Sequence, residues 1–383
     1  MQILIAPDKF KGSLTADEAA RAIAIGLTRA LPGATLDLLP VADGGEGTVD
    51  ALVEATGGER REATVSGPLG DPVRATWGVL GDGRTAVIEA ASVCGLALVP
   101  LERRDPRVTS SRGLGELLRV VLDAGFSEVI GGLGGTGTND GGAGLAQALG
   151  ATLLDQDGRE LPPGGGALSR LARLDASALA PLRRALHVTC ACDVQSPLAG
   201  PDGASLVFAA QKGATPEVAR ALDQALARWG VALARDASVS VADQPGAGAA
   251  GGLGAGLAAL LGGALVSGAD LVLDAVGFDA RAARADLVVT GEGALDAQTR
   301  RAKAPMAVLR RARALGRPVV ALAGQLYDDA WTLEQDGLAA ALPCVTRLLT
   351  LDEATRDAGP LLARAAETLG RLLALGRQLG LAH

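Results

Sequence analysis

Residues 131–144 read GGLGGTGTNDGGAG, and this stretch contains Asn139, the only asparagine among 383 residues. Apolar residues precede and follow it, so the pattern predicts a buried strand, a glycine loop and then a helix over 141–150. Glycine-rich backbone can approach a ligand closely, and a helix N-terminus attracts anions, so the arrangement is typical of phosphate binding. Asn139 and Asp140 stand where the loop meets the helix, and an Asx cap explains them equally well on structural grounds.

Lysine is also rare in this chain. Four of the 36 basic residues are lysine, namely Lys9, Lys11, Lys212 and Lys303, and arginine supplies the rest. An ammonium group is a compact point charge that fits against a phosphoryl oxygen, whereas guanidinium is a wide planar fork. The lysines fall in the segments DKFKGS, QKG and RAKAP. We therefore expect at least two of them to contact a ligand.

Length and charge limit the classes of function. A chain of 383 residues is long enough for two domains, because single cores stop growing at roughly 250 to 300 residues. The net charge is −7 and no basic run stands out, so nucleic acid and anionic membranes are not expected partners. The first residues, MQILIAPD, resemble neither a signal peptide nor a membrane span, which predicts a cytoplasmic protein.

Cysteine and histidine usage limits the chemistry. The four cysteines are scattered and lack the spacing of a zinc site, so we expect buried free thiols. The chain has two histidines, His187 in a strand-like segment and His383 at the end. Neither a Ser-His-Asp nor a Cys-His arrangement is available, so acid–base chemistry must use carboxylates or lysine.

The order of predicted elements indicates two domains. Strands at 2–6, 36–41 and 286–290 each run into a charged, glycine-bearing loop, whereas 61–90 alternates like an antiparallel meander. We therefore predict an α/β fold of two α/β domains. Residues 1–60 and 283–383 would form a parallel Rossmann-like or flavodoxin-like sheet from both chain ends, and 61–282 would be an inserted mixed α/β domain. The active site is expected in the cleft between them.

Known nucleotide motifs are missing or weak. No GxxxxGK[ST] occurs, and GGLGAG at 251–256 matches GxGxxG only loosely. For residues 248–263, helix packing through small residues is the favoured interpretation over ligand contact.

Five carboxylates are predicted just beyond strands: Asp8, Asp43, Asp193, Glu292 and Asp296. Acids that hold a metal or accept a hydroxyl proton, with lysines and glycine amides that hold phosphate, fit Mg-nucleotide phosphoryl transfer. For any single acid, a capping or turn role explains its position as well; the five together favour the phosphoryl-transfer interpretation.

The segments PDKFKGSL, ADGGEGT, GGTGTNDGG, ACDV, QKG, PGAGAAGGLGAG and GEGALDAQ follow one another along essentially the whole chain. This ordered series resembles the bacterial type 1 glycerate kinase family. The resemblance implies phosphorylation of the small-molecule substrate D-glycerate with ATP and Mg²⁺, with 2-phosphoglycerate as the favoured product. It also implies two α/β domains, one formed from both chain ends.

The residues that match the family motifs are Lys11, Asp43, Glu46, Asn139, Asp140, Asp193, Lys212, Glu292, Asp296 and Lys303. We expect Asp193 or Asp43 to accept the substrate hydroxyl proton, with Lys11 also catalytic. Glu292 and Asp296 are the expected metal ligands. Substrate or phosphate contacts are expected from Gly134, Gly135, Thr136, Asn139, Asp140, Lys212, Lys303 and Glu46.

The chain also departs from the family pattern. Lys9 occupies a common serine position, Arg112 a usual tyrosine position, and Gln195 and Ser196 replace the residues expected after ACDV. Ala294 replaces an arginine and Ala302 replaces a glycine, so no arginine side chain at position 294 can take part in the site. The alternatives are a kinase for another small hydroxy acid and a non-catalytic nucleotide or phosphometabolite sensor. A nicotinamide-dependent dehydrogenase would lack a histidine base.

Overall fold

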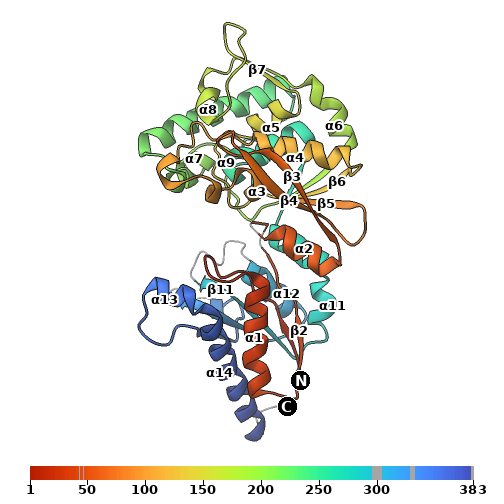
Figure 1. Ribbon diagram of the computed structural model, residues 1–383, viewed down its shortest axis with the longest axis vertical. Helices are drawn as coiled ribbons and strands as arrows, with labels where there is room; N and C mark the ends of the chain where they lie inside the picture. The colour runs from red at the N-terminus through yellow and green to blue at the C-terminus, as the bar shows by residue number, and fades with distance from the viewer. Residues whose placement is uncertain (43, 46, 296–303, 328–332, 381–383) are drawn as a thin grey trace. The chain divides into compact units, whose positions relative to one another are not determined.

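The computed structural model describes residues 1–42, 44–45, 47–295, 304–327 and 333–380. Contacts group the chain into two compact units (Figure 1). The terminal unit contains Met1–Asp43 and Ala269–His383, and the inner unit contains Gly44–Gly268. The domain limits near residues 60 and 283 stay predictions. Across the described ranges, no helix is both long and apolar enough to cross a membrane.

The terminal unit is built on a parallel sheet from both chain ends. Its strands, within the described residues, are β1 (Gln2–Ile5), β2 (Thr35–Leu38), β11 (Leu287–Leu295), β12 (Val319–Leu326) and β13 (Ala340–Pro343). They lie in the order β13-β12-β11-β1-β2, and all neighbours are parallel. Ile3 pairs with Leu287, which joins the two ends of the chain. Numbered along the sequence, this is the flavodoxin-like order 2-1-3-4-5, so the expected fold class is confirmed.

Helices cover this sheet. They are α1 (Ala16–Ala30), α11 (Phe278–Ala282), α12 (Ala304–Ala314), α13 (Leu351–Arg356) and α14 (Ala358–Gln378), with α10 (Gly268–Ala275) starting where the chain leaves the inner unit. Thr15 and Glu18 form a capping box at the start of α1. Helices α1 and α14 pack side by side (Figure 1). Gly26 permits this approach, because a Cβ there would lie 2.0 Å from the Ala363 carbonyl oxygen.

The inner unit contains a mixed sheet. Its strands, as far as the chain is described, are β3 (Glu59–Ser66), β4 (Pro72–Val79), β5 (Thr85–Glu89), β6 (Glu128–Gly132), β9 (His187–Ala191) and β10 (Ala264–Val266). Strands β3, β4 and β5 form the expected antiparallel meander, whereas β5, β6, β9 and β10 are parallel neighbours. A separate hairpin, β7 (Thr152–Leu154) with β8 (Arg173–Asp175), was not predicted.

The helices of the inner unit enclose a large apolar core. They are α2 (Thr48–Thr56), α3 (Ala90–Cys94), α4 (Arg112–Asp123), α5 (Ala143–Ala148), α6 (Ala180–Ala185), α7 (Ala204–Phe208), α8 (Pro216–Asp236) and α9 (Ala249–Leu261). Trp229 of α8 and Leu117 of α4 are completely buried in that core. Helix α2 packs on β3, β4 and β5, so its apolar face belongs to the inner unit.

Two elements differ from the sequence-based prediction. Helix α5 is shorter than 141–150, because Gly141 and Gly142 adopt φ of +64° and +80°, which belong to the loop. Strand β11 continues past the predicted end at 290, so Glu292 lies inside a strand and not beyond it. The extension is stabilised by parallel pairing with β12, in which Glu292 lies opposite Ala323.

Candidate functional site

The glycine loop after β6 packs directly against the segment Gly44-Gly45. The Gly134 amide donates to the Gly44 carbonyl at 3.2 Å. A Cβ on Gly132 would lie 2.7 Å from the Gly44 oxygen, and one on Gly134 would lie 2.6 Å from the Gly45 Cα. Real Cβ contacts are longer than this, so both positions require glycine for close backbone approach. The two loops are therefore held together at the carboxyl end of the parallel strands.

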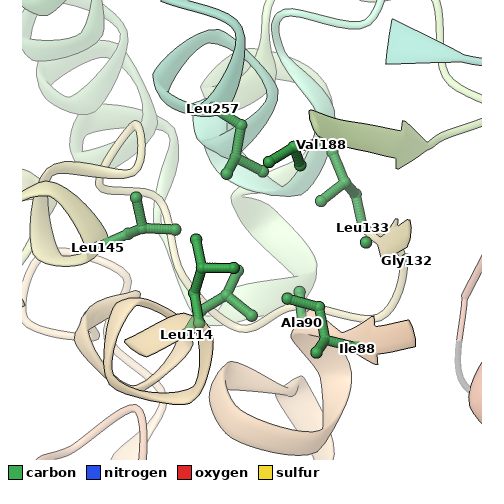
Figure 2. Close-up of a pocket in the computed structure, with 10 residues that line it drawn as sticks. Ile88, Ala90, Leu114, Gly132, Leu133, Leu145, Val188 and Leu257 are labelled. Atoms are coloured by element: carbon green, nitrogen blue, oxygen red, sulfur yellow. The ribbon is translucent and has the colours of Figure 1, made fainter. Parts of the chain in front are cut away.

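Below this loop lies a small apolar cavity of about 10 Å³. Figure 2 shows Ile88, Leu114, Leu133, Leu145 and Val188 pointing into it from separate elements. A space of this volume with only apolar lining neither holds a substrate nor favours a water molecule. The end of β6 and the start of the loop therefore pack on apolar side chains, and this cavity is not a ligand site.

The following loop residues differ in burial: Gly134 is partly buried, Gly135 is exposed and Thr136 is buried. Gly135 has a φ of +75°, and its carbonyl accepts from the Leu96 amide at 2.8 Å. Thr136 forms a bridge with Gly95 and is 5% exposed. The structure therefore brings Gly134, Gly135 and Thr136 together in one firmly packed turn.

Asp140 organises the end of the loop from inside the protein. It is fully buried, and its carboxylate accepts from the Ser111 amide at 2.7 Å and from the Ser111 hydroxyl at 3.0 Å. The amides of Gly142 and Gly144 also donate to it, at 3.2 and 3.3 Å. Burial raises the pKa of Asp140 and these donors oppose the change. The side chain thus does what the capping interpretation expected at the start of α5.

Asn139 and Lys212 lie beside Asp140 in the same interior. The Asn139 Nδ2 donates to Ser205 Oγ at 2.8 Å, whereas its buried Oδ1 has no hydrogen-bond partner among the described residues. Lys212 is 3% exposed and donates to the Thr138 carbonyl at 2.6 Å. Desolvation lowers the pKa of Lys212 to about 8, and the Cys94 and Asp140 side chains oppose this shift.

The second glycine-rich segment packs on the first. The Gly141 amide donates to the Gly251 carbonyl at 3.0 Å, and Gly251 and Gly252 adopt φ of +69° and +88°. A Cβ on Gly251 would lie 2.1 Å from the Thr138 oxygen, and one on Gly256 would lie 2.5 Å from the Gly141 oxygen. These contacts agree with the interpretation of residues 248–263 as helix packing through small residues.

Asp193 follows β9 at the carboxyl edge of the inner sheet. Its Oδ1 accepts from the Gly268 amide at 2.9 Å and from the Ser267 hydroxyl at 3.2 Å. The neighbouring thiol of Cys192 has its pKa raised to about 11 by burial and by the charge of Asp193. Asp193 is only partly buried, which sets it apart from the fully buried Asp140.

In the terminal unit, charged residues collect where the strand order reverses, between β1 and β11. Such switch points are where open α/β sheets bind ligands. The Asp8 amide donates to the Gly291 carbonyl at 2.8 Å, and a Cβ on Gly293 would lie 3.3 Å from the Lys11 amide nitrogen. Lys11 itself is exposed. The loop after β1 therefore lies against Glu292 and Gly293, and it presents a lysine.

The carboxylates at this switch point suit Mg²⁺. Asp8 and Glu292 are 4% and 7% exposed; Asp8 lies in the loop after β1, and Glu292 lies in β11, the strand that pairs with β1. Magnesium bound with nucleotide phosphates commonly takes only one or two carboxylates from the protein. Among the described side chains, no three His, Cys, Asp or Glu gather in a metal-binding group. Glu292 and Asp8 thus fit a site that nucleotide phosphates and water complete.

Four predicted site residues, Asp43, Glu46, Asp296 and Lys303, lie outside the described residues.

The structure also shows supporting residues that the sequence analysis missed. Ser111 and Ser205 bind Asp140 and Asn139, Ser267 binds Asp193, and Glu89 accepts from the Val49 amide at 2.5 Å at the start of α2. Glu89 is the last residue of β5, just as Asp193 closely follows β9. Its position at a strand end could therefore have marked it as a candidate site residue in the sequence.

Known proteins resemble this chain in sequence and fold along almost its whole length. The family model described as the glycerate kinase family matches residues 3–374. A glycerate kinase of Bacillus subtilis (strain 168) is 47% identical, covering 98% of this chain and 99% of the relative. A glycerate 2-kinase of Escherichia coli (strain K12) is 46% identical over the same shares.

A solved structure agrees with these relatives. It is a crystal structure from Salmonella typhimurium LT2 whose description names glycerate kinase 2. It superposes with a TM-score of 0.85 at 46% identity and covers 99% of both chains. The chain belongs to the glycerate kinase family.

Proposed function

We propose that this enzyme phosphorylates D-glycerate at its 2-hydroxyl with ATP and Mg²⁺, and that it belongs to the bacterial type 1 subdivision. The E. coli relative is named glycerate 2-kinase and is 46% identical over 98% of this chain. The single observation that carries the proposal is the partly buried Asp193, held by two donors at the carboxyl end of β9. Parallel strand ends are where α/β enzymes place their reactive groups.

Asp193 is proposed as the acid that accepts the substrate proton. Hydroxyl attack on a phosphoryl group needs a carboxylate that orients the hydroxyl and takes its proton. Asp193 fits this need because two hydrogen bonds to Oδ1 fix the direction of its carboxylate at the carboxyl edge of the inner sheet. The buried Asp140 is committed to four donors, so its proposed part is to hold the loop. Asp43 remains the second proposed acid.

Phosphate binding is proposed for Lys11 and for the amides of Gly135 and Thr136, whereas the Gly134 amide donates to the Gly44 carbonyl and holds the loop in place. Lys11 is the exposed ammonium at the switch point of the terminal sheet. Lys212 and Asn139 are proposed to act on substrate through the loop that they support, and Lys303 and Glu46 keep their proposed contacts. Glu292 would hold Mg²⁺ together with Asp8 or Asp296, and the ion when bound would neutralise charge on the phosphate oxygens.

A coupled assay for ADP formation tests the proposal. D-glycerate should support turnover, whereas L-glycerate and lactate at the same concentration should support far less. Asp193→Asn should remove most turnover while the protein remains folded in a thermal melt. ATP binding without turnover on any hydroxy acid would instead identify a sensor, and faster turnover on lactate would identify a different hydroxy-acid kinase.

A further inference from the structure

Strand β10 ends beside β9, and this register brings two distant segments together. Ala191 lies opposite Val266, and the Cys192 amide donates to the Val266 carbonyl at 2.9 Å. Because the strands are parallel, the residues that follow each of them emerge at the same edge of the sheet. Asp193 follows β9 and Ser267 follows β10, so the backbone itself places the two side chains next to each other.

The contact between them is specific to one oxygen. Ser267 Oγ donates to Asp193 Oδ1 at 3.2 Å, and the Gly268 amide donates to the same oxygen at 2.9 Å. A carboxylate turns readily about its last side-chain torsion, because that torsion has broad minima. Two donors fixed on a strand end restrict the turn, and both stabilise the ionised form.

We propose that Ser267 is a positioning residue for phosphoryl transfer, which rests on the proposed function of Asp193 as proton acceptor. The hydroxyl fixes the carboxylate plane so that Asp193 orients the substrate hydroxyl at the moment of attack. Ser267 itself contacts neither substrate nor nucleotide in this account. It acts on the rate of the chemical step and leaves substrate binding nearly unchanged, because misplacing a reacting group weakens the transition state more than the ground state.

If the contact between Ser267 and Asp193 were purely structural, the kinetics of a Ser267 variant would differ from those that the proposal predicts. Asp193 also accepts from the first amide of α10, so its carboxylate could serve only to cap that helix. Removing the Ser267 hydroxyl leaves the Gly268 donor in place, so the cap would persist. Capping alone therefore predicts unchanged kinetics for a folded Ser267→Ala protein.

The test compares Ser267→Ala and Ser267→Thr with Ser169→Ala in the full chain. Ser169 is an exposed serine of the same unit whose hydroxyl donates to the Gly166 carbonyl, so it controls for loss of a serine hydroxyl. Thermal melts establish that each variant is folded. Steady-state ADP formation with D-glycerate then gives kcat and KM separately.

We expect Ser267→Ala to lower kcat about tenfold, which corresponds to about 1.4 kcal/mol in the barrier, with KM for D-glycerate within about twofold of the parent. Ser267→Thr should restore most of kcat, and Ser169→Ala should match the parent. Unchanged kcat in Ser267→Ala would overturn the proposal. A change confined to KM would also overturn it, and so would a loss of kcat that Ser267→Thr does not restore. Absence of turnover with D-glycerate in the parent enzyme would contradict the proposed function. An active parent enzyme with unchanged kcat in Ser267→Ala would contradict only the role of Ser267.

Discussion

A methyl group added at Gly134 should damage the enzyme through a contact that the structure defines. The new Cβ would lie 2.6 Å from the Gly45 Cα and 3.3 Å from the Gly45 amide nitrogen. Carbon atoms pack at about 3.5–4.0 Å, so the two loops must separate by roughly 1 Å. Overpacking of this kind costs about 1–3 kcal/mol. For a unit of this size, that corresponds to a melting temperature lower by about 2–10 °C.

Gly131→Ala is the matched control for Gly134→Ala, because neither glycine adopts a positive φ. Among the described residues other than its chain neighbours, the one atom within 4 Å of a Cβ at Gly131 is Ile88 Cγ1, at 4.0 Å, and Gly131 lines the small apolar cavity. The methyl should fit there, and alanine lowers the entropy of the unfolded chain, so stability should stay equal or rise by about 1 kcal/mol.

Thermal melts and ADP-coupled kinetics on both variants test this pair. Gly134→Ala should melt earlier and lose at least tenfold in kcat/KM, while Gly131→Ala keeps parental activity. Parental behaviour of Gly134→Ala would refute the close packing of the loops. Equal losses of stability and activity in both variants would show that a methyl group is harmful anywhere from the end of β6 into the loop. The contact with Gly45 would then not be the cause.

The other predictions concern charged side chains. Lys11→Arg should cut kcat about a hundredfold by removing a compact cation from the phosphate, whereas Lys9→Arg should stay near parental activity; equal kinetics of the two variants would refute the special role of Lys11. Burial lowers the pKa of Lys212 in the folded protein to about 8, from the 10.5 that is ordinary for a lysine. The unfolded chain therefore binds more protons between those pH values, and this residue's contribution to stability is complete above pH 10.5 and lost as pH falls through 8. Relative to Lys212→Met, the parental free energy of unfolding should rise by up to about 3 kcal/mol across that window, and parallel pH curves from chemical denaturation would contradict this. Asp193→Asn should lower kcat by about 10²- to 10⁴-fold with its melting temperature nearly unchanged, and parental turnover in the coupled assay would exclude it as proton acceptor.

Local signals predicted much of the fold. Thr15 and Glu18 are three residues apart, so their capping box can be read directly from the sequence, and α1 begins there. The alternation over 61–90 likewise predicted the meander. Glycine misled the prediction at 291–293, where it suggested a loop. Pairing with a neighbour distant in sequence decided the outcome, because β12 continues alongside β11 as far as Leu295 and Leu326.

The candidate site was less predictable because its supports are far apart in sequence. Lys212 stands in QKG and was expected to contact substrate or phosphate, and its ammonium donates to a carbonyl 74 residues away. Asp140 takes its strongest contacts from Ser111, which is 29 residues earlier. The sequence correctly marked these residues as unusual, but it could not show that they are buried and bonded to other parts of the inner unit.

Phosphorus NMR of the reaction products tests the central claim most directly. The purified enzyme is mixed with ATP, Mg²⁺ and D-glycerate, in the absence of any mutase, and the phosphoglycerate signal is assigned against authentic standards. We predict 2-phosphoglycerate, formed in step with ADP. A dominant 3-phosphoglycerate signal would contradict the proposed site of attack, and the absence of any phosphoglycerate would contradict the proposed function.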